Sequence, residues 1–182
     1  MNGESKPLLS RVADSVYWMA RYMERAENVA RFMGVNLHLQ LDLPMDPVNQ
    51  WAPLIDTSGD AEIFKERYGE PTRANVVRFL VFDPLNLNSI YSCLRAAREN
   101  ARSIRETISS EMWEQINSLY LLVQSTPPET NVESLPEFFH SIRMGCHLFQ
   151  GITDTTMTHG EAWHFLRMGR KLERADKTTR IL

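Results

Sequence analysis

The stretches RYMERAENVAR, residues 21–31, and RKLERADKTTR, residues 170–180, share the pattern R-x-x-E-R-A-[ED]-x-x-x-R. Glu173 of the second copy matches Glu24 of the first, an offset of 173 − 24 = 149 residues. Apolar residues recur at three- and four-residue steps from Val12 to Leu37, which is the period of an amphipathic helix. The pattern therefore predicts one long charged helix that occurs twice, as an internal repeat.

A helical wheel of the first copy predicts where its charges lie relative to the core. At about 100° per residue, Glu24 falls well inside the polar half and Glu27 falls at one edge of the apolar stripe. Arg25 falls at the other edge, beside Trp18 and Tyr22. We therefore expect Arg25 to stack on one of these rings.

Three interpretations of the repeated charges stay open. A solvated face would gain only about 0.2–0.5 kcal/mol from each local pair, Glu27 with Arg31 and Arg21 with Glu24. A polar network between helices, or a ligand or partner site, would better explain why the pattern occurs twice. The candidate residues on the two copies are Arg21, Glu24, Arg25, Glu27 and Arg31, and Arg170, Glu173, Arg174, Asp176 and Arg180.

An arginine stripe follows in the middle of the chain, beside the apolar positions Leu94 and Ala101. Its members, Arg95, Arg98, Arg102 and Arg105, fall in one narrow arc of a helix. Guanidinium groups bind carboxylates in bidentate fashion. We expect Glu24 or Glu173 to meet this stripe across a helix interface, or the stripe to bind an anionic ligand such as a phosphate or a carboxylate.

The rest of the chain is also helical by its pattern, because glycine is scarce, with 8 residues, and β-branched runs are rare. We predict an all-α bundle or array of about five long helices with short connecting helices. The long helices are expected at 10–39, 86–109, 110–124, 135–157 and from 158 onward, and the short ones at 48–55, 61–68 and 73–82, with a proline-containing loop at 42–49.

Capping boxes are expected to open the last two helices, Ser134 with Glu137 and Thr158 with Glu161. The last helix is still periodic at Leu182, so we expect the chain to be the N-terminal part of a longer protein.

Composition excludes several classes of function. The formal net charge of −3 argues against bulk electrostatic binding to nucleic acid. The sequence contains no apolar run long enough to span a membrane and no N-terminal signal region. Cys93 and Cys146, the 2 cysteines, are expected to be buried free thiols in a reducing compartment. We therefore expect a cytoplasmic protein.

Catalytic and metal-binding motifs are weak. Cys146 precedes His147, but adjacent helical residues point about 100° apart, which disfavours a nucleophile and base. No Walker A or G-x-G-x-x-G sequence is present. We expect neither a metal nor a cofactor.

Two metal sites are alternatives on the sequence alone. The segments Glu137-x-x-His140 and Glu161-x-x-His164, with Glu24 and Glu99, could supply a di-iron site, and His159, Glu161 and His164 could supply a zinc site. The capping roles explain Glu137 and Glu161 without a metal.

Four stretches carry a resemblance to a known family. They are Tyr17–Arg31, FDPLNLNSI at Phe82–Ile90, ARENARSIRETISSEMWEQIN at Ala97–Asn117, and HGEAWHFLRMGRKLERADKTTRIL at His159–Leu182. With these stretches the sequence resembles the alpha-E family, a bacterial helical domain named for its ER motif. Only the ER positions carry over, as Glu24-Arg25 and Glu173-Arg174.

The resemblance implies an all-helical protein, longer than this chain, in which the second ER motif opens a second repeat. Residues 1–182 would then be a single alpha-E-type domain, cut where that repeat begins. Such domains occur beside, or fused to, circularly permuted ATP-grasp proteins and transglutaminase-like proteins.

Three functions follow as expectations. The first is an accessory domain that acts with an ATP-grasp-type partner in ATP-dependent amide or peptide ligation, which rests on the resemblance. The second is an enzyme whose site is the Glu/Arg cluster, and the third is a structural bundle or a homodimer formed through the last helix.

Overall fold

The computed structural model describes residues 8–42, 47–127 and 134–181, and in these ranges every regular element is a helix. The long helices are α1 (Ser10–Asp42), α5 (Ile90–Ser103), α6 (Ser110–Ser125), α7 (Leu135–Thr156) and α8 (Glu161–Thr179). The short helices are α2 (Pro47–Ser58), α3 (Ala61–Tyr68), α4 (Arg73–Val77) and a π-helical turn, η1 (Arg78–Phe82). The predicted all-α class is confirmed.

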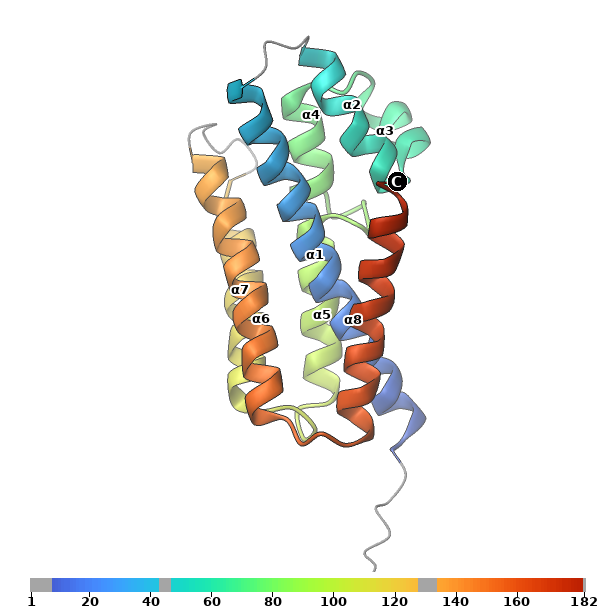
Figure 1. The fold of residues 1–182 in the computed structure, drawn as a ribbon, viewed down its shortest axis with the longest axis vertical. Coiled ribbons are helices and arrows are strands. Elements are labelled where there is room, and N and C mark those ends of the chain that lie inside the picture. Colours follow the sequence, from blue (N-terminus) through green and yellow to red (C-terminus); the bar gives the residue numbers. More distant parts are fainter. Residues whose placement is uncertain (1–7, 43–46, 128–133, 182) are drawn as a thin grey trace, which may run out of the picture.

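Helix α1 is the central element of the bundle, and it packs against α5, α7 and α8 (Figure 1). Helix α8 runs in the same direction as α1, whereas α5 and α7 run in the opposite direction. Helices α2 and α3 lie at the end of the bundle where α1 finishes. The two ER helices are therefore parallel neighbours.

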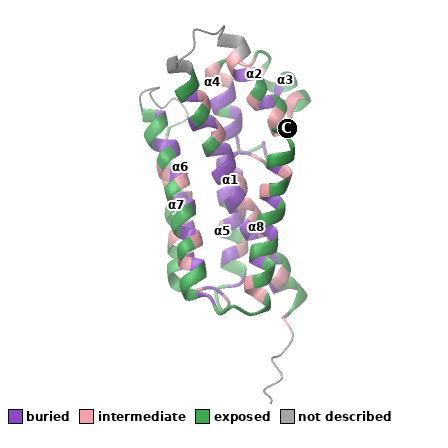
Figure 2. Ribbon diagram, viewed as in Figure 1, coloured by how far each residue is buried: buried purple, intermediate pink, exposed green. Residues whose placement is uncertain are grey.

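The apolar stripe predicted on α1 forms the core, and buried positions follow this helix along the bundle (Figure 2). The buried members of the stripe are Val12, Val16, Met19, Met23, Ala26, Ala30, Met33 and Leu37. Because neighbours surround α1, polar residues outside the stripe are buried too, including Glu24 and Glu27. The wheel placed Glu24 in the polar half of α1, and α8 covers that half, so the interpretation of a solvated face does not hold for Glu24.

Most helix boundaries agree with the sequence pattern, with two instructive differences. The helix predicted at 86–109 is shorter at both ends. It begins only at Ile90, where the Ser89 side chain accepts a hydrogen bond from the Ser92 amide, and it ends at Ser103. The predicted loop at 42–49 is shorter, because α2 begins at Pro47, and residues 43–46 lie outside the described residues.

Neither predicted capping box forms. Ser134 is the N-cap residue of α7, but its side chain makes no capping hydrogen bond to the helix. Helix α8 instead begins at Glu161 with Gly160 as its N-cap residue, so the Thr158 box was wrong. The carboxylate of Glu161 accepts a hydrogen bond from the amide of Leu8 at 2.8 Å, which ties the starts of α1 and α8 together.

A glycine allows α1 and α8 to approach closely. A Cβ atom at Gly169 would lie 2.4 Å from the carbonyl oxygen of Tyr17. Any larger residue at this position would push the two backbones apart.

Candidate functional site

The two ER motifs bind each other across the interface of α1 and α8. Arg25 donates from Nε to Oε1 of Glu173 at 2.7 Å and from Nη2 to Oε2 at 2.9 Å, a bidentate pair. Arg21 adds a third hydrogen bond, from Nε to Oε2 of Glu173 at 2.9 Å. Both oxygens of the second motif's glutamate are therefore occupied by the first motif's arginines.

The opposite half of the cluster repeats this arrangement. Arg174 donates from Nε to Oε1 of Glu24 at 2.6 Å, and Nε of Arg170 lies 3.4 Å from Oε2 of Glu24. Arg170 and Arg174 stand at the repeat positions of Arg21 and Arg25. Each glutamate thus binds the two arginines of the other copy, as expected for parallel helices related by a local twofold axis along them.

The carboxylates of the cluster are removed from solvent. Glu24 and Glu173 are both buried, and a buried charge has to be paired and hydrogen-bonded. Burial alone would raise the pKa of Glu173, but hydrogen bonds and positive charge from Arg25 and Arg21 outweigh burial, so its pKa lies below the ordinary range. The same contacts raise the pKa of Arg25 against the opposing effect of burial.

A second pair of repeated contacts flanks the cluster. Glu27 accepts a hydrogen bond from Arg31, and Asp176 accepts one from Arg180 at 3.1 Å, and each pair is four residues apart in the sequence. The predicted pair of Glu27 with Arg31 is confirmed. The predicted pair of Arg21 with Glu24 was wrong, because Arg21 reaches across to Glu173 instead.

The two halves of the cluster differ in how many of their buried polar atoms have a hydrogen-bond partner. Oε2 of Glu24, Oε2 of Glu27 and Nε of Arg170 are sealed from solvent, and none has a hydrogen-bond partner within the described part of the chain. Nη2 of Arg174 lies 3.9 Å from Oε2 of Glu27, and Nε of Arg170 lies 3.4 Å from Oε2 of Glu24. The Glu173 half is therefore the tighter of the two.

Aromatic rings support the arginines of the first motif. The guanidinium of Arg25 lies 5.7 Å from the ring centroid of Tyr22, and that of Arg21 lies 5.2 Å from the ring centroid of Trp18. The expected stacking of Arg25 is confirmed, with Tyr22 as its partner.

The arginine stripe does not meet either ER glutamate, so this prediction was wrong. Arg98 donates to Asn117 of α6 at 2.7 Å and lies over the rings of Trp113 and Tyr120, at 5.4 and 5.1 Å. Arg105 lies over Trp113 at 4.6 Å. Arg98 and Arg105 thus pack on aromatic residues of α6.

The two remaining members of the stripe have local partners. Arg95 lies 5.6 Å from the ring centroid of Tyr91, and Arg102 forms an ion pair with Glu99 at 2.7 Å. Binding of an anionic ligand to the stripe stays a prediction.

The loop before α5 extends the cluster, and the sequence reasoning missed it. Oδ1 of Asn88 accepts a hydrogen bond from Nη1 of Arg25 at 2.8 Å, and Nδ2 of Asn88 donates to Asp60 at 2.9 Å. The side chain of Asn86 holds the amide of Asn88 at 2.9 Å. The sequence does contain an indication of this turn. It is the run DPLNLNS at 83–89, whose Asp, Asn and Ser residues are typical of turns and which lies between two apolar helices.

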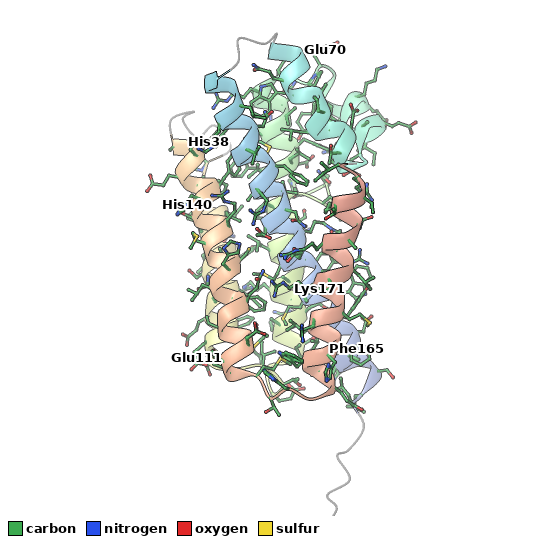
Figure 3. The ribbon with its side chains drawn as sticks, in the orientation of Figure 1. His38, Glu70, Glu111, His140, Phe165 and Lys171 are labelled. Carbon is green, nitrogen blue, oxygen red and sulfur yellow. The ribbon has the colours of Figure 1, made fainter. Side chains whose placement is uncertain are left out.

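The metal alternatives do not come together. The E-x-x-H segments open α7 and α8 at opposite ends of the bundle, as the labelled His140 and Phe165 show (Figure 3). Within residues 8–42, 47–127 and 134–181, no three His, Cys, Asp or Glu side chains lie close enough to share a metal.

The cysteines are buried free thiols, as predicted. Burial raises the pKa of Cys146, and its Sγ contacts the carbonyl oxygen of Met23 at 3.7 Å. The ring of His147 faces Glu27 at 3.4 Å, so it does not activate Cys146.

Fold and cluster together define an all-helical domain organised around a duplicated Glu-Arg motif. A family model described as "a predicted alpha-helical domain with a conserved ER motif" matches residues 8–182. The chain therefore belongs to the Alpha-E family. The part of the chain that the structure describes has no helix with the length and apolarity needed to cross a membrane.

Similar proteins from mycobacteria carry no established function. An uncharacterized protein of Mycobacterium bovis and two of Mycobacterium tuberculosis are each 24% identical over 191 residues, which covers 94% of this chain. The chain spans 22% of the length of these relatives. No solved structure matches it.

Proposed function

We propose that this protein is an accessory helical domain that acts with a circularly permuted ATP-grasp-type partner in ATP-dependent amide or peptide ligation. A transglutaminase-like protein is the further partner that the family resemblance suggests. The setting is the cytoplasm, where ATP is available and the free thiols Cys93 and Cys146 stay reduced. The observation that supports a binding role is an exposed apolar face on α8.

That face contains Phe165, Met168 and Leu172, whose exposed fractions are 37%, 45% and 48%. Their repeat counterparts on α1 are Val16, Met19 and Met23, with exposed fractions of 0%, 0% and 3%. The same three positions therefore form a core face in one ER helix and an open face in the other.

The open face borders a groove of about 420 Å³, which Tyr17 and Asp14 of α1 also line. Contiguous exposed apolar surface of this kind marks sites of protein interaction. In this proposal residues 1–182 form one Alpha-E-type unit, and α8 presents the face that α1 buries against its helical neighbours. The partner surface is accordingly helical and apolar.

An enzyme built on the Glu/Arg cluster has less support. A general base works best with a pKa near the operating pH, whereas the pKa of Glu173 is lowered by its two arginines. Arg98 binds Asn117 of α6 and Arg102 pairs with Glu99, so neither converges with the glutamates of the cluster. The cluster instead acts as a lock that sets the register of α8 on α1.

Co-elution of the full chain with an ATP-grasp-type protein, mixed at micromolar concentration, tests the binding role. We expect a complex with wild type, and loss of that complex with Leu172→Glu, which places a charge in the apolar face. Leu148→Glu is the matched control, because Leu148 is as exposed on α7 but lies outside this face. Separate elution, or a complex unaffected by Leu172→Glu, contradicts the proposal.

A second copy of the chain is the alternative occupant of the same face. Light scattering distinguishes it, since a homodimer has twice the monomer mass of 21.1 kDa and Leu172→Glu restores the monomer. Such a dimer would support the structural reading in place of the accessory role.

A further inference from the structure

A cavity between α1, α7 and α8 is lined by two residues of the cluster, Glu24 and Arg170, and by Thr153 of α7. Oε2 of Glu24 and Nε of Arg170 are sealed from solvent, and neither has a hydrogen-bond partner within the described part of the chain. Buried polar atoms are nearly always hydrogen-bonded, either to protein or to an ordered water molecule. These two atoms therefore point to a partner that is not a protein group.

The repeat shows how the two halves of the lock differ at this contact. In the Glu173 half, Nε of Arg21 donates directly to Oε2 of Glu173 at 2.9 Å. Its counterpart, Nε of Arg170, lies 3.4 Å from Oε2 of Glu24 and forms no hydrogen bond with it. Two atoms at this separation can both reach a third atom at about 2.8–3.0 Å that lies to one side of the line between them. The Glu24 half can therefore accommodate one bridging atom between guanidinium and carboxylate.

The cavity has the size of one water molecule. Its volume is about 20 Å³, and a cavity needs at least about 10–15 Å³ to hold a water. A buried water typically makes about three hydrogen bonds, and Thr153 offers the third partner. Thr153 is buried, and its hydroxyl donates to the carbonyl oxygen of Phe149 at 2.8 Å. Because that hydrogen is already used, the Thr153 oxygen is left to act as an acceptor.

The three polar groups require a ligand that both accepts and donates hydrogen bonds. Nε of Arg170 only donates, whereas the carboxylate of Glu24 and the hydroxyl oxygen of Thr153 accept. A metal ion or an ammonium group could not accept from Arg170, and an anion without hydrogens could not donate to Glu24. Water has two hydrogens and two lone pairs, so it matches one donor and two acceptors.

We propose that this cavity is the binding site of one ordered water molecule that bridges Arg170 and Glu24 and completes the Glu24 half of the lock. The water accepts from Nε of Arg170 and donates to Oε2 of Glu24 and to the hydroxyl oxygen of Thr153. It takes the place of the direct bond between Arg21 and Glu173 in the other half. Through Thr153 it also connects α7 to the two ER helices. The site is independent of the apolar face of α8 on which the proposed function rests.

A crystal structure of the full chain, at a resolution that shows ordered waters, tests the position of this water. We expect a peak within about 2.6–3.2 Å of both Oε2 of Glu24 and Nε of Arg170. Glu173 is the internal control, because Arg25 and Arg21 bind its oxygens directly, and no water should separate it from them. A cavity without a peak, or a direct hydrogen bond from Nε of Arg170 to Oε2 of Glu24, overturns the proposal.

Magnetic relaxation dispersion of the water oxygen tests the same site in solution, because it detects waters that stay bound for longer than the protein tumbles. Thr153→Val removes one acceptor at nearly constant volume, so the dispersion amplitude should fall by the contribution of one water. Thr155→Val is the matched control, since its hydroxyl also donates to the carbonyl four residues earlier at 2.8 Å but does not line the cavity. This control should keep the wild-type amplitude. An unchanged amplitude in Thr153→Val, or an equal fall in both variants, contradicts the proposal.

Discussion

Glu24 and Glu173 stand at the same position of the two ER helices, and each binds the arginines that follow and precede the other. Glu173 binds Arg25 and Arg21, and Glu24 binds Arg174 and Arg170. One motif cannot make this contact alone, because its own glutamate and arginine point to a neighbour. The duplicated motif is therefore a reciprocal interhelical lock, and its order of charges is fixed by the parallel pairing of α1 and α8.

The first prediction concerns the unequal halves of this lock. Glu173→Ala should destabilise the fold by about 3–5 kcal/mol, because it leaves two mostly buried guanidinium groups unpaired. Glu24→Ala should cost less, since Arg174 is 44% exposed and can turn to water. Urea denaturation, with comparison of midpoints at constant slope, measures both. Glu99→Ala is a surface control expected to change stability by less than about 0.5 kcal/mol. Equal losses in the two glutamate variants would contradict the asymmetry.

The second prediction concerns acid. The pKa of Glu173 is lower folded than unfolded, so its stabilising effect is fully present above the ordinary glutamate pKa of about 4.3. That effect is lost as the pH falls from this value through the lowered folded pKa. The difference in unfolding free energy between wild type and Glu173→Gln should therefore be constant near neutrality and shrink below about pH 4. A difference that stays constant into acid would show that the carboxylate charge contributes nothing.

The third prediction tests the close approach of the ER helices. Gly169→Ala should destabilise the protein by about 1–3 kcal/mol, because its Cβ would lie 2.4 Å from the Tyr17 carbonyl oxygen and force the helices apart. Gly151→Ala, in helix α7 with no atom within 4 Å of a new Cβ, should instead stabilise by roughly 0.5–1 kcal/mol. Thermal unfolding of both variants measures the two changes in stability. A change of the same sign in the two would contradict the proposal that Gly169 allows the helices to approach closely.

Local pattern predicted the helices well because periodicity and turn residues act over short distances. The helix predicted at 61–68 is α3, and the predicted 110–124 is α6 to within one residue. Of the three interpretations of the repeated charges, the contacts between α1 and α8 support the polar network between helices. The wrong predictions concern which residues contact each other. A helical wheel gives the direction of Glu24 on its own helix, but it does not show that α8 packs on that side.

The contacts of the arginine stripe and of Asn88 depend on tertiary packing, which local sequence pattern does not show. The arginine stripe was expected to seek carboxylates, but α6 presents Trp113 and Tyr120 to it. Asn88 bridges Arg25 and Asp60 only because the turn at 83–89 brings three distant segments together. To predict either set of contacts, one would need to know how α5 packs against its neighbours.

The last prediction separates the members of that stripe. Arg98→Ala should destabilise the fold by about 1–2 kcal/mol, since the guanidinium loses the hydrogen bond to Asn117 and its contacts with two rings. Arg102→Ala should change stability by less than about 0.5 kcal/mol, because its pair with Glu99 is exposed on both sides. Chemical denaturation gives the stabilities, and Trp113 fluorescence should shift only in Arg98→Ala. If the two variants lose equal stability, the contacts of Arg98 with α6 add nothing to the stability of the fold. The loss of one positive charge would then explain both changes.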